Sequence, residues 1–140
     1  EGLDRVSGML RDALARVETR DRLWIDDVTL VAVWDCETED GARRYLSDDV
    51  LGLGDESQEL LAGDDDEASH GLRVWRRLGN GTLDVVVEPM HTDTSKIYVR
   101  LVYSDDDVAD GADAVIESAE AVNEYLHGPL VAFVRARARR

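Results

Sequence analysis

The stretch Arg73–Glu88 reads RVWRRLGNGTLDVVVE, an arginine-rich segment with one tryptophan, a glycine-flanked asparagine and a valine run. Asn-Gly between two segments of alternating polarity is the strongest short-range signal for a β-hairpin. We therefore predict strands at 72–78 and 82–89, joined by Asn80-Gly81 as a two-residue loop. A further strand is expected at 96–104, where apolar residues alternate with polar ones.

The position of this loop predicts which residues face one another. Arg77 is expected opposite Asp84, and each earlier residue opposite a later one. The third strand is assigned the same parity, and a five-residue loop at 90–94 is assumed. One face of the meander would then carry three rows: Arg73–Glu88–Lys96, Trp75–Val86–Tyr98 and Arg77–Asp84–Arg100. The opposite face is apolar except for Arg76, whose long stem can reach an edge.

The whole chain is predicted to have an α+β fold. We expect an antiparallel sheet of about five strands, hairpin 28–47 plus meander 72–104, packed with an N-terminal helix and a C-terminal helix. The first strand, 28–34, is apolar on both faces, which is typical of a central strand. The turn Glu39-Asp40-Gly41 would return the chain into Arg43–Leu46. No linker divides the sequence, so residues 1–140 are predicted to form a single domain.

Helices are predicted from apolar residues at helical spacing. Residues 2–19 and 108–126 each carry one apolar stripe, and a short helix is expected at 57–62. The acidic cluster Asp105-Asp106-Asp107 suits the N-terminus of the second long helix, and Gly128-Pro129 suits its end. The tail after Pro129 favours a helix over a strand. Residues 48–70 are otherwise ambiguous, with Gly63–Glu67 read as an exposed acidic loop.

The composition is strongly acidic, with 31 acidic against 16 basic residues and a formal net charge of -15. Fifteen arginines accompany a single lysine, Lys96. This bias is typical of proteins from high-salt environments, where molar salt screens the repulsion of an acidic surface. A GC-rich genome also favours Arg, Asp, Ala and Val. Both explanations describe an environment and assign no activity.

The expected location is the cytoplasm or a virion. The first ten residues, EGLDRVSGML, do not resemble a signal peptide, and no apolar run has the ~20 residues that cross a bilayer, so no membrane contact is expected. The single cysteine, Cys36, excludes an internal disulfide and fits a reducing compartment.

No catalytic, cofactor or metal signature is present, so the protein is predicted not to be an enzyme and to need no cofactor. His70, His91 and His127 lie far apart and do not form a zinc set with Cys36. An EF-hand frame would use Asp106, Asp110 and Glu117, but its third position is the apolar Val108, which argues against calcium. An enzyme using convergent carboxylates from the acidic runs would require a pocket with raised pKa values.

The face with Trp75 is the candidate contact surface. An aromatic pair rimmed by arginines is typical of protein-binding hot spots, and more loosely of sheets that stack single-stranded bases. Two other interpretations remain open: the arginines simply pair with acidic neighbours, or Leu130, Val131, Phe133 and Val134 of the tail cover this face. The predicted partner-binding residues are Trp75, Tyr98, Arg73, Arg77, Arg100, Arg135, Arg137 and Arg139.

These observations favour a non-enzymatic interaction or assembly protein that docks onto a partner or its own copies. In its order of helices and sheet the chain is similar, without any shared motif, to tail-terminator and neck proteins of tailed viruses and to small acidic chaperones of bacterial secretion systems. The resemblance would imply virion assembly in a halophilic system, or chaperoning. A single-stranded nucleic-acid-binding module is the alternative, acting through the sheet face or the basic tail.

Overall fold

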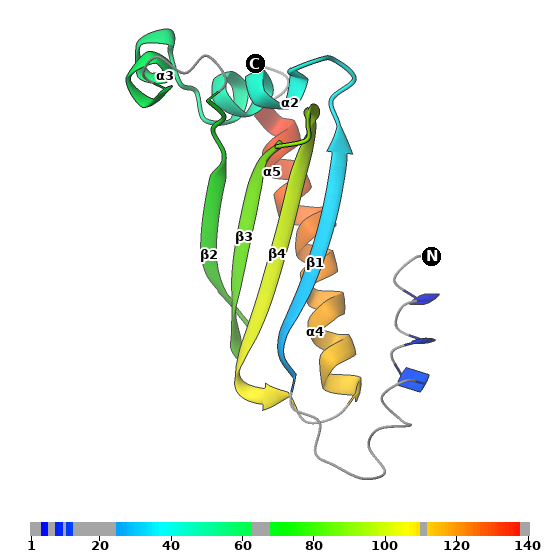
Figure 1. Cartoon of the computed structure of the whole chain (residues 1–140). Coiled ribbons are helices and arrows are strands. Elements are labelled where there is room, and N and C mark those ends of the chain that lie inside the picture. The colour runs from blue at the N-terminus through cyan, green and yellow to red at the C-terminus, as the bar shows by residue number, and fades with distance from the viewer. Residues whose placement is uncertain are drawn as a thin grey trace.

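The computed structural model describes residues 4–5, 8–9, 11–12, 25–62, 68–109 and 112–137 of the chain. The fold is α+β, with one antiparallel sheet and a layer of helices (Figure 1). The elements follow one another as β1 (Ile25–Asp35), α2 (Gly41–Arg44), the π-helical turn η1 (Tyr45–Val50), α3 (Asp55–Ala62), β2 (Leu72–Leu78), β3 (Gly81–Met90), β4 (Asp93–Ala109), α4 (Ala112–Tyr125), the π-helical turn η2 (Leu126–Leu130) and α5 (Val131–Arg137).

The sheet has four strands in the order β1-β4-β3-β2, with every neighbouring pair antiparallel. The meander of β2, β3 and β4 is confirmed. The prediction of a central first strand is wrong, because among the described strands β1 pairs with β4 alone and lies at the edge of the sheet. The two apolar faces of β1 therefore differ in burial. Val28, Leu30, Ala32 and Trp34 pack against the core, whereas Val31 and Val33 on the other face stay exposed.

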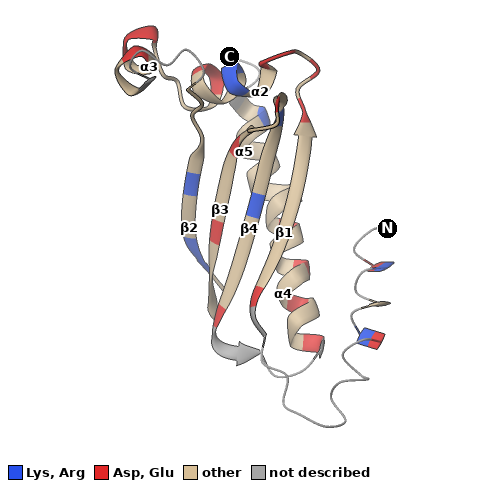
Figure 2. Ribbon diagram, viewed as in Figure 1, with Lys and Arg blue, Asp and Glu red and all other residues tan. Residues whose placement is uncertain are grey.

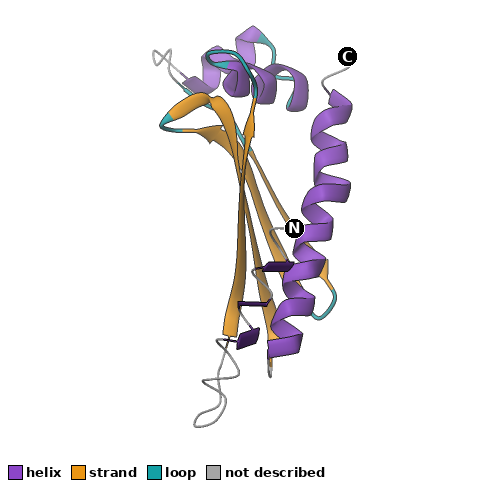
Figure 3. Ribbon diagram, turned by 90° about the vertical axis from the view of Figure 1, so that its right-hand side faces the viewer, coloured by secondary structure: helices purple, strands orange, loops and turns teal. Residues whose placement is uncertain are grey.

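The continuous helical layer α4-η2-α5 lies along one face of the sheet (Figure 3). Val122, Leu126, Leu130 and Val134 recur every four residues, and all four are buried against the strands. From the sheet side the core is completed by alternate residues of β3 and β4, among them Leu83, Val85, Val87, Ile97, Val99 and Leu101. Burial of this single apolar seam is the main stabilising contribution to the fold.

The hairpin between β2 and β3 forms, but its loop is Gly79-Asn80 and not Asn80-Gly81, because Leu78 pairs with Gly81. Gly79 has a φ of 57°, which a glycine adopts without strain. Gly81 is the first residue of β3, and this position requires a glycine, since a Cβ there would fall 2.6 Å from Cζ of Tyr103. The loop between β3 and β4 is also shorter than assumed, with only His91 and Thr92 between the two strands.

The Gly79-Asn80 loop shifts each predicted β2–β3 pairing by two residues, and a register irregularity between Pro89 and Met90 shifts each predicted β3–β4 pairing by two residues. Arg73 lies opposite Val86, Trp75 opposite Asp84, and Val86 opposite Arg100. A shift of two positions keeps every side chain on its predicted face, because successive side chains of a strand alternate between the two faces. The predicted faces are therefore confirmed, while the predicted rows are wrong.

The predicted strand at Arg43–Leu46 is wrong, and with it the hairpin 28–47 and the count of five strands. Residues after Asp40 form α2 and η1, which lie at one end of the sheet (Figure 1). Ala42, Leu46 and Val50 are spaced by four residues, and at most 5% of each is exposed. Their helical spacing buries all three at once, which a strand with period two would not do.

Both predicted boundaries of the last helix are also wrong. Strand β4 continues through Asp105-Asp106-Asp107 to Ala109, where pairing with Ile25 of β1 extends the sheet, so α4 begins only at Ala112. Gly128-Pro129 does not end the helix, because the wider turn η2 includes Pro129 and α5 follows directly. The prediction of a helical tail is confirmed for Val131–Arg137.

Other predictions concern parts of the chain with few described residues. The short helix at 57–62 is confirmed as part of α3. The predicted helix 2–19 lies mostly outside the described residues, although the six described positions between Asp4 and Asp12 are helical. Arg11 Nε lies 3.6 Å from a carboxylate oxygen of Asp113, in the first turn of α4. The predicted acidic loop Gly63–Glu67 is outside the described residues.

Candidate protein-binding face

The face of the sheet opposite α4 and α5 is the candidate site, and we call it the open sheet face. Its side chains are all exposed or half-buried. It consists of every second residue of each strand: Asp27, Thr29, Val31, Val33 and Asp35 on β1; Lys96, Tyr98, Arg100, Val102 and Ser104 on β4; Thr82, Asp84, Val86 and Glu88 on β3; and Arg73, Trp75 and Arg77 on β2.

Large apolar side chains are exposed on this face. Trp75 is 63% exposed, Val31 is 52% exposed and Val33 is 49% exposed. Tyr98 is half-buried between Val33 and Glu88, its neighbours in register. The hypothesis that Leu130 and the residues after it cover this face is wrong, because Leu130 and Val134 are buried on the other side of the sheet. Exposed apolar residues that gather on one face mark a surface that can bind a partner.

Arg73 fixes the position of the tryptophan. Its guanidinium lies 4.4 Å from the centre of the Trp75 ring, within the range of a cation–π contact. The same guanidinium donates two hydrogen bonds to the Asp84 carboxylate, at 2.9 and 2.8 Å. These bonds lower the pKa of Asp84 and raise the pKa of Arg73, so both groups stay charged. The indole is thereby held between a fixed cation and solvent.

The predicted opposite-charge pairs are replaced by this diagonal pair. Asp84 lies opposite Trp75, and Arg73 reaches it from the neighbouring position on β2. Arg100 on β4 also lowers the pKa of Asp84. Arg76 lies on the other face of the sheet. Its guanidinium is 5.1 Å from the ring centre of Tyr125 in α4, so this arginine links β2 to the helical layer.

The charges of the open sheet face alternate from strand to strand (Figure 2). On this face β1 carries Asp27 and Asp35, β4 carries Lys96 and Arg100, β3 carries Asp84 and Glu88, and β2 carries Arg73 and Arg77. Lys96 also pairs with Asp93 of the adjoining hairpin, at 2.8 Å. The described side chains of the meander alone would give this face a surplus of two cations. Because β1 adds two aspartates beside β4, the charges of the described side chains balance.

The predicted site residues fall into two groups that the fold separates. Arg73, Trp75, Arg77, Tyr98 and Arg100 lie together on the open sheet face. Arg135 is exposed on α5, in the helical layer on the opposite side of the sheet. The side chain of Arg137 and the whole of Arg139 are outside the described residues. Val31 and Val33 were not included in the candidate site predicted from the sequence. The signal for them is the apolar character of both faces of 28–34, because a strand at the edge of the sheet leaves one of these faces exposed.

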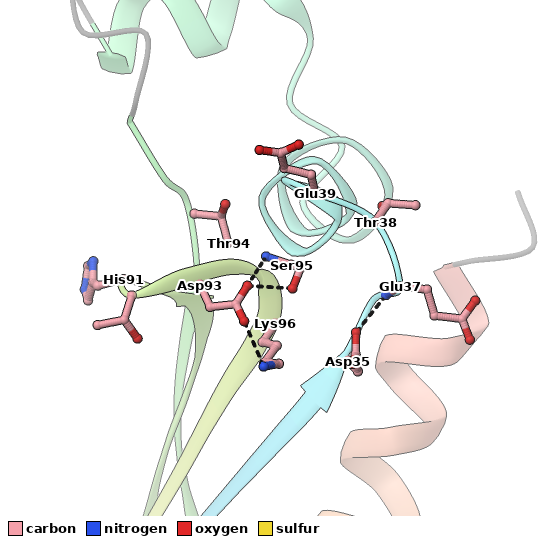
Figure 4. A pocket seen from close by; sticks show the side chains of 10 residues that line it. Asp35, Glu37, Thr38, Glu39, His91, Asp93, Thr94, Ser95 and Lys96 are labelled. Carbon is pink, nitrogen blue, oxygen red and sulfur yellow. Dashed lines mark hydrogen bonds and ion pairs between the residues drawn. The ribbon is translucent and has the colours of Figure 1, made fainter.

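A depression of about 630 Å³ lies at one end of the sheet, between the chain that follows β1 and the β3–β4 hairpin (Figure 4). Two of the carboxylates that line it, Asp93 and Asp35, accept hydrogen bonds within the two loops. Asp93 accepts hydrogen bonds from the Ser95 backbone N–H and hydroxyl and contacts Lys96, which together lower its pKa to about 2. Asp35 accepts the N–H of Glu37 at 2.9 Å. These bonds shape two turns and leave no base poised near neutral pH at Asp93.

The other chemically distinctive residues lie apart from one another. Burial first, and Asp35 second, raise the pKa of the Cys36 thiol, which keeps it protonated and unreactive at neutral pH. Nδ1 of His70 lies 3.2 Å from the Ser47 hydroxyl, while His91 and His127 are exposed. Within the described residues, no three groups of His, Cys, Asp or Glu are placed to hold a metal ion. Of the EF-hand frame, Glu117 is exposed on α4, while the side chain of Asp106 and all of Asp110 are outside the described residues.

The fold and the face together define an α+β protein with one covered and one open sheet face. No protein-family model matches the chain, and no curated protein or solved structure matches it either. None of the described helices combines the length and the apolar character that a membrane-spanning helix requires.

Proposed function

We propose that this protein is an interaction or assembly module that binds a protein partner through the open sheet face. The observation that carries the proposal is the exposure of Trp75, Val31 and Val33 on a face framed by arginines. Trp, Tyr and Arg are the residues that contribute most often to binding hot spots. Trp and Tyr bury a large area with few rotatable bonds, and Arg offers five hydrogen-bond donors on a planar group.

The fixed position of Trp75 on the open sheet face supports binding. A side chain that is already fixed loses less conformational entropy when a partner covers it. Trp75 is fixed in this way by Arg73, which is itself held by two hydrogen bonds to Asp84. The face therefore combines an exposed apolar area with an arrangement that changes little on docking.

Single-stranded nucleic acid receives less support as the partner. Binding to a polyanion depends on a surplus of cations along the groove or face. In the part of the open sheet face whose side chains are described, four cations are balanced by four anions, and the chain as a whole carries -15. The acidic composition suits a module that works in concentrated salt, as expected for assembly in a halophilic cell or virion.

Site-specific photo-crosslinking in the native host tests this proposal. A photoreactive phenylalanine analogue would replace Trp75 in one variant and Glu120, which is exposed on α4, in a matched control. We expect a defined protein adduct at position 75, identified by mass spectrometry, and little adduct at position 120. Equal yields at the two positions would contradict the proposal, since the open sheet face would then have no preference for a partner.

A further inference from the structure

We propose that the partner of the open sheet face is a second copy of this chain, packed face to face about a two-fold axis parallel to the strands. This inference rests on the proposed function and names its partner. Two sheets that pack in this way lie about 10 Å apart and bury their facing side chains, as in β-sandwiches.

The order of charges across the sheet selects this arrangement. From β1 through β4 and β3 to β2, the strands of the open sheet face are acidic, basic, acidic and basic. A two-fold axis along the strands reverses this order in the second copy. It places β1 over β2 of the other copy and β4 over β3, so that strands with acidic side chains face strands with basic ones. In register, Asp27 comes directly over Arg77. Asp84 and Glu88 each come within one same-face position of Arg100 of the other copy.

The alternative two-fold axis, across the strands, gives the opposite result. It places each strand over its own counterpart, so that acidic β1 faces acidic β1 and basic β2 faces basic β2. Like charges brought together across an interface cost several kcal/mol in specific complexes. The alternation over an even number of strands therefore fits one face-to-face orientation and disfavours the other.

The apolar residues follow the same correspondence. The axis along the strands brings β2, with Trp75, over β1, with Val31 and Val33. These three are the most exposed large apolar side chains of the face. In register, Trp75 comes over Thr29 of the other copy, since the two share a cross-strand row through Asp84 and Val102. Val31 lies one same-face position further along and comes over Arg73, so each tryptophan is placed beside the apolar part of β1, and because the contact is symmetric this happens twice in the dimer.

Charge and area both favour this face over the rest of the molecule. Among the described side chains the charges of the open sheet face sum to zero, so two copies of a chain with a net charge of -15 approach here with the least repulsion. Four strands and nine positions along β1 give a buried area on the order of 1,200 Å² in total, the lower end of the range for specific interfaces.

A charge-swap experiment tests the proposal. Asp27 and Arg77 lie in one cross-strand row, through Ser104 and Thr82, so the axis along the strands brings Asp27 of one copy near Arg77 of the other. In the variant Asp27→Arg alone two cations would meet, and in Arg77→Asp alone two anions would meet. When the two variants are mixed, opposite charges meet at both places.

We expect the wild type to form dimers in sedimentation equilibrium, and each single variant to dimerise about tenfold more weakly. An equimolar mixture should form a heterodimer with wild-type affinity, detected by native mass spectrometry after isotope labelling of one variant. Glu120→Arg and Arg44→Asp change the net charge equally on exposed positions outside this face, and they should not affect dimerisation. Thermal unfolding of each variant checks that it folds.

The outcomes separate this inference from the proposed function. A monomeric wild type, single variants that dimerise as the wild type does, or a mixture that stays monomeric would each overturn the homodimer. If the crosslink at position 75 then joins a different protein, the interaction function stands and only its partner changes. If position 75 gives no specific crosslink as well, both proposals fail.

Discussion

Arg73 is the residue on which the open sheet face depends most. It stacks on Trp75 and holds Asp84 with two hydrogen bonds, so one guanidinium sets the positions of an aromatic and an anion on two strands. Lysine would not replace it, because an ammonium cannot make both the planar stack and the paired hydrogen bonds. The face is therefore sensitive to a change that preserves the charge at this position.

Asp93 gives the structure a pH dependence at the β3–β4 hairpin. Its pKa in the folded protein is about 2, held there by Lys96 and Ser95. In the unfolded chain an aspartate titrates near pH ~3.9. A lowered folded-state pKa stabilises the protein above the unfolded value, and this contribution disappears as the pH falls through about 2.

We therefore expect Asp93→Asn to lower the free energy of unfolding by a constant amount above pH ~5, and by progressively less below pH ~4. Urea denaturation of the wild type and the variant across this range measures the difference. Glu120→Gln, at an exposed position on α4, serves as the control. A difference that stays constant down to pH ~2 would show that Asp93 does not titrate as described.

For single residues, the sequence predicted correctly which face of the sheet a side chain lies on, but not which residue of the neighbouring strand lies opposite it. Alternation along 72–78 and 96–104 placed Trp75 and Tyr98 on one face correctly, because the pleat of a strand allows only two directions. The choice between Asn80-Gly81 and Gly79-Asn80 as the loop depended on the Tyr103 ring beside Gly81. That contact joins two strands and leaves no signal in the hairpin sequence.

Among the elements, the helical layer is distinguished by a π-helical turn at a proline. Proline lacks the backbone N–H that an α-helix requires, and its ring clashes with the preceding turn. In η2 the wider turn accommodates Pro129, while Leu126 and Leu130 remain on the buried side with Val134 of α5. Core packing therefore carries the helix through a sequence that normally ends one.

The glycines at the ends of β3 and in η2 should respond in opposite ways to alanine. A Cβ at Gly81 would overlap the Tyr103 ring and the Ser104 carbonyl, so we expect Gly81→Ala to lower the free energy of unfolding by about 1–3 kcal/mol. At Gly128 nothing lies within 4 Å of a new Cβ, and a helical glycine is costly. Gly128→Ala should raise stability by about 0.5–1 kcal/mol.

Denaturant unfolding of both variants against the wild type measures these two effects. Each variant is the control for the other, because the chemical change is the same. If Gly81→Ala is neutral, the Tyr103 ring and the Ser104 carbonyl cannot lie as close to this position as described. If Gly128→Ala is destabilising, the residue must adopt a conformation that alanine avoids.

The elements with a regular period were the ones that sequence predicted well. Strands β2, β3 and β4 follow period two, and α4 follows the helical period. The segment after β1 was assigned to a strand on the strength of a turn at Asp40-Gly41, although Ala42, Leu46 and Val50 carried a helical signal over only three positions. Short elements with few apolar residues are where local turn preferences mislead.

At the scale of the whole molecule, the large negative net charge is not spread evenly over the surface of the fold. The chain carries -15, while the described charges of the open sheet face alternate in sign from strand to strand and sum to zero. Repulsion among the remaining carboxylates opposes the compact state, and salt screens it. Stability should therefore depend strongly on ionic strength.

We expect the thermal unfolding midpoint to rise by roughly 5 °C or more between about 0.1 M and about 2 M NaCl. Circular dichroism at protein concentrations low enough to keep the chain monomeric measures this without a contribution from self-association. Sodium chloride and potassium chloride should act alike if screening is the cause. A midpoint that does not change with salt would contradict the role given to repulsion.

The order of the strands could not be predicted from sequence. Loops fixed the neighbours of β3, since a two-residue hairpin allows only adjacent antiparallel strands. Nothing comparable links β1 to β4, which are separated by the helices at the end of the sheet and by the whole β2–β3 hairpin. The alternating charges of the open sheet face were therefore invisible until β1 was placed.

The pairing of β1 with β4 has a consequence for folding during translation on the ribosome. When Ile25–Asp35 leaves the exit tunnel, its partner Asp93–Ala109 has not yet been translated. An apolar segment that must wait for a distant partner is open to wrong pairing in the meantime, and contacts distant in sequence form slowly. During translation there is thus an interval in which β1, apolar on both faces, has no strand to pair with. The rate of elongation sets how long that interval lasts.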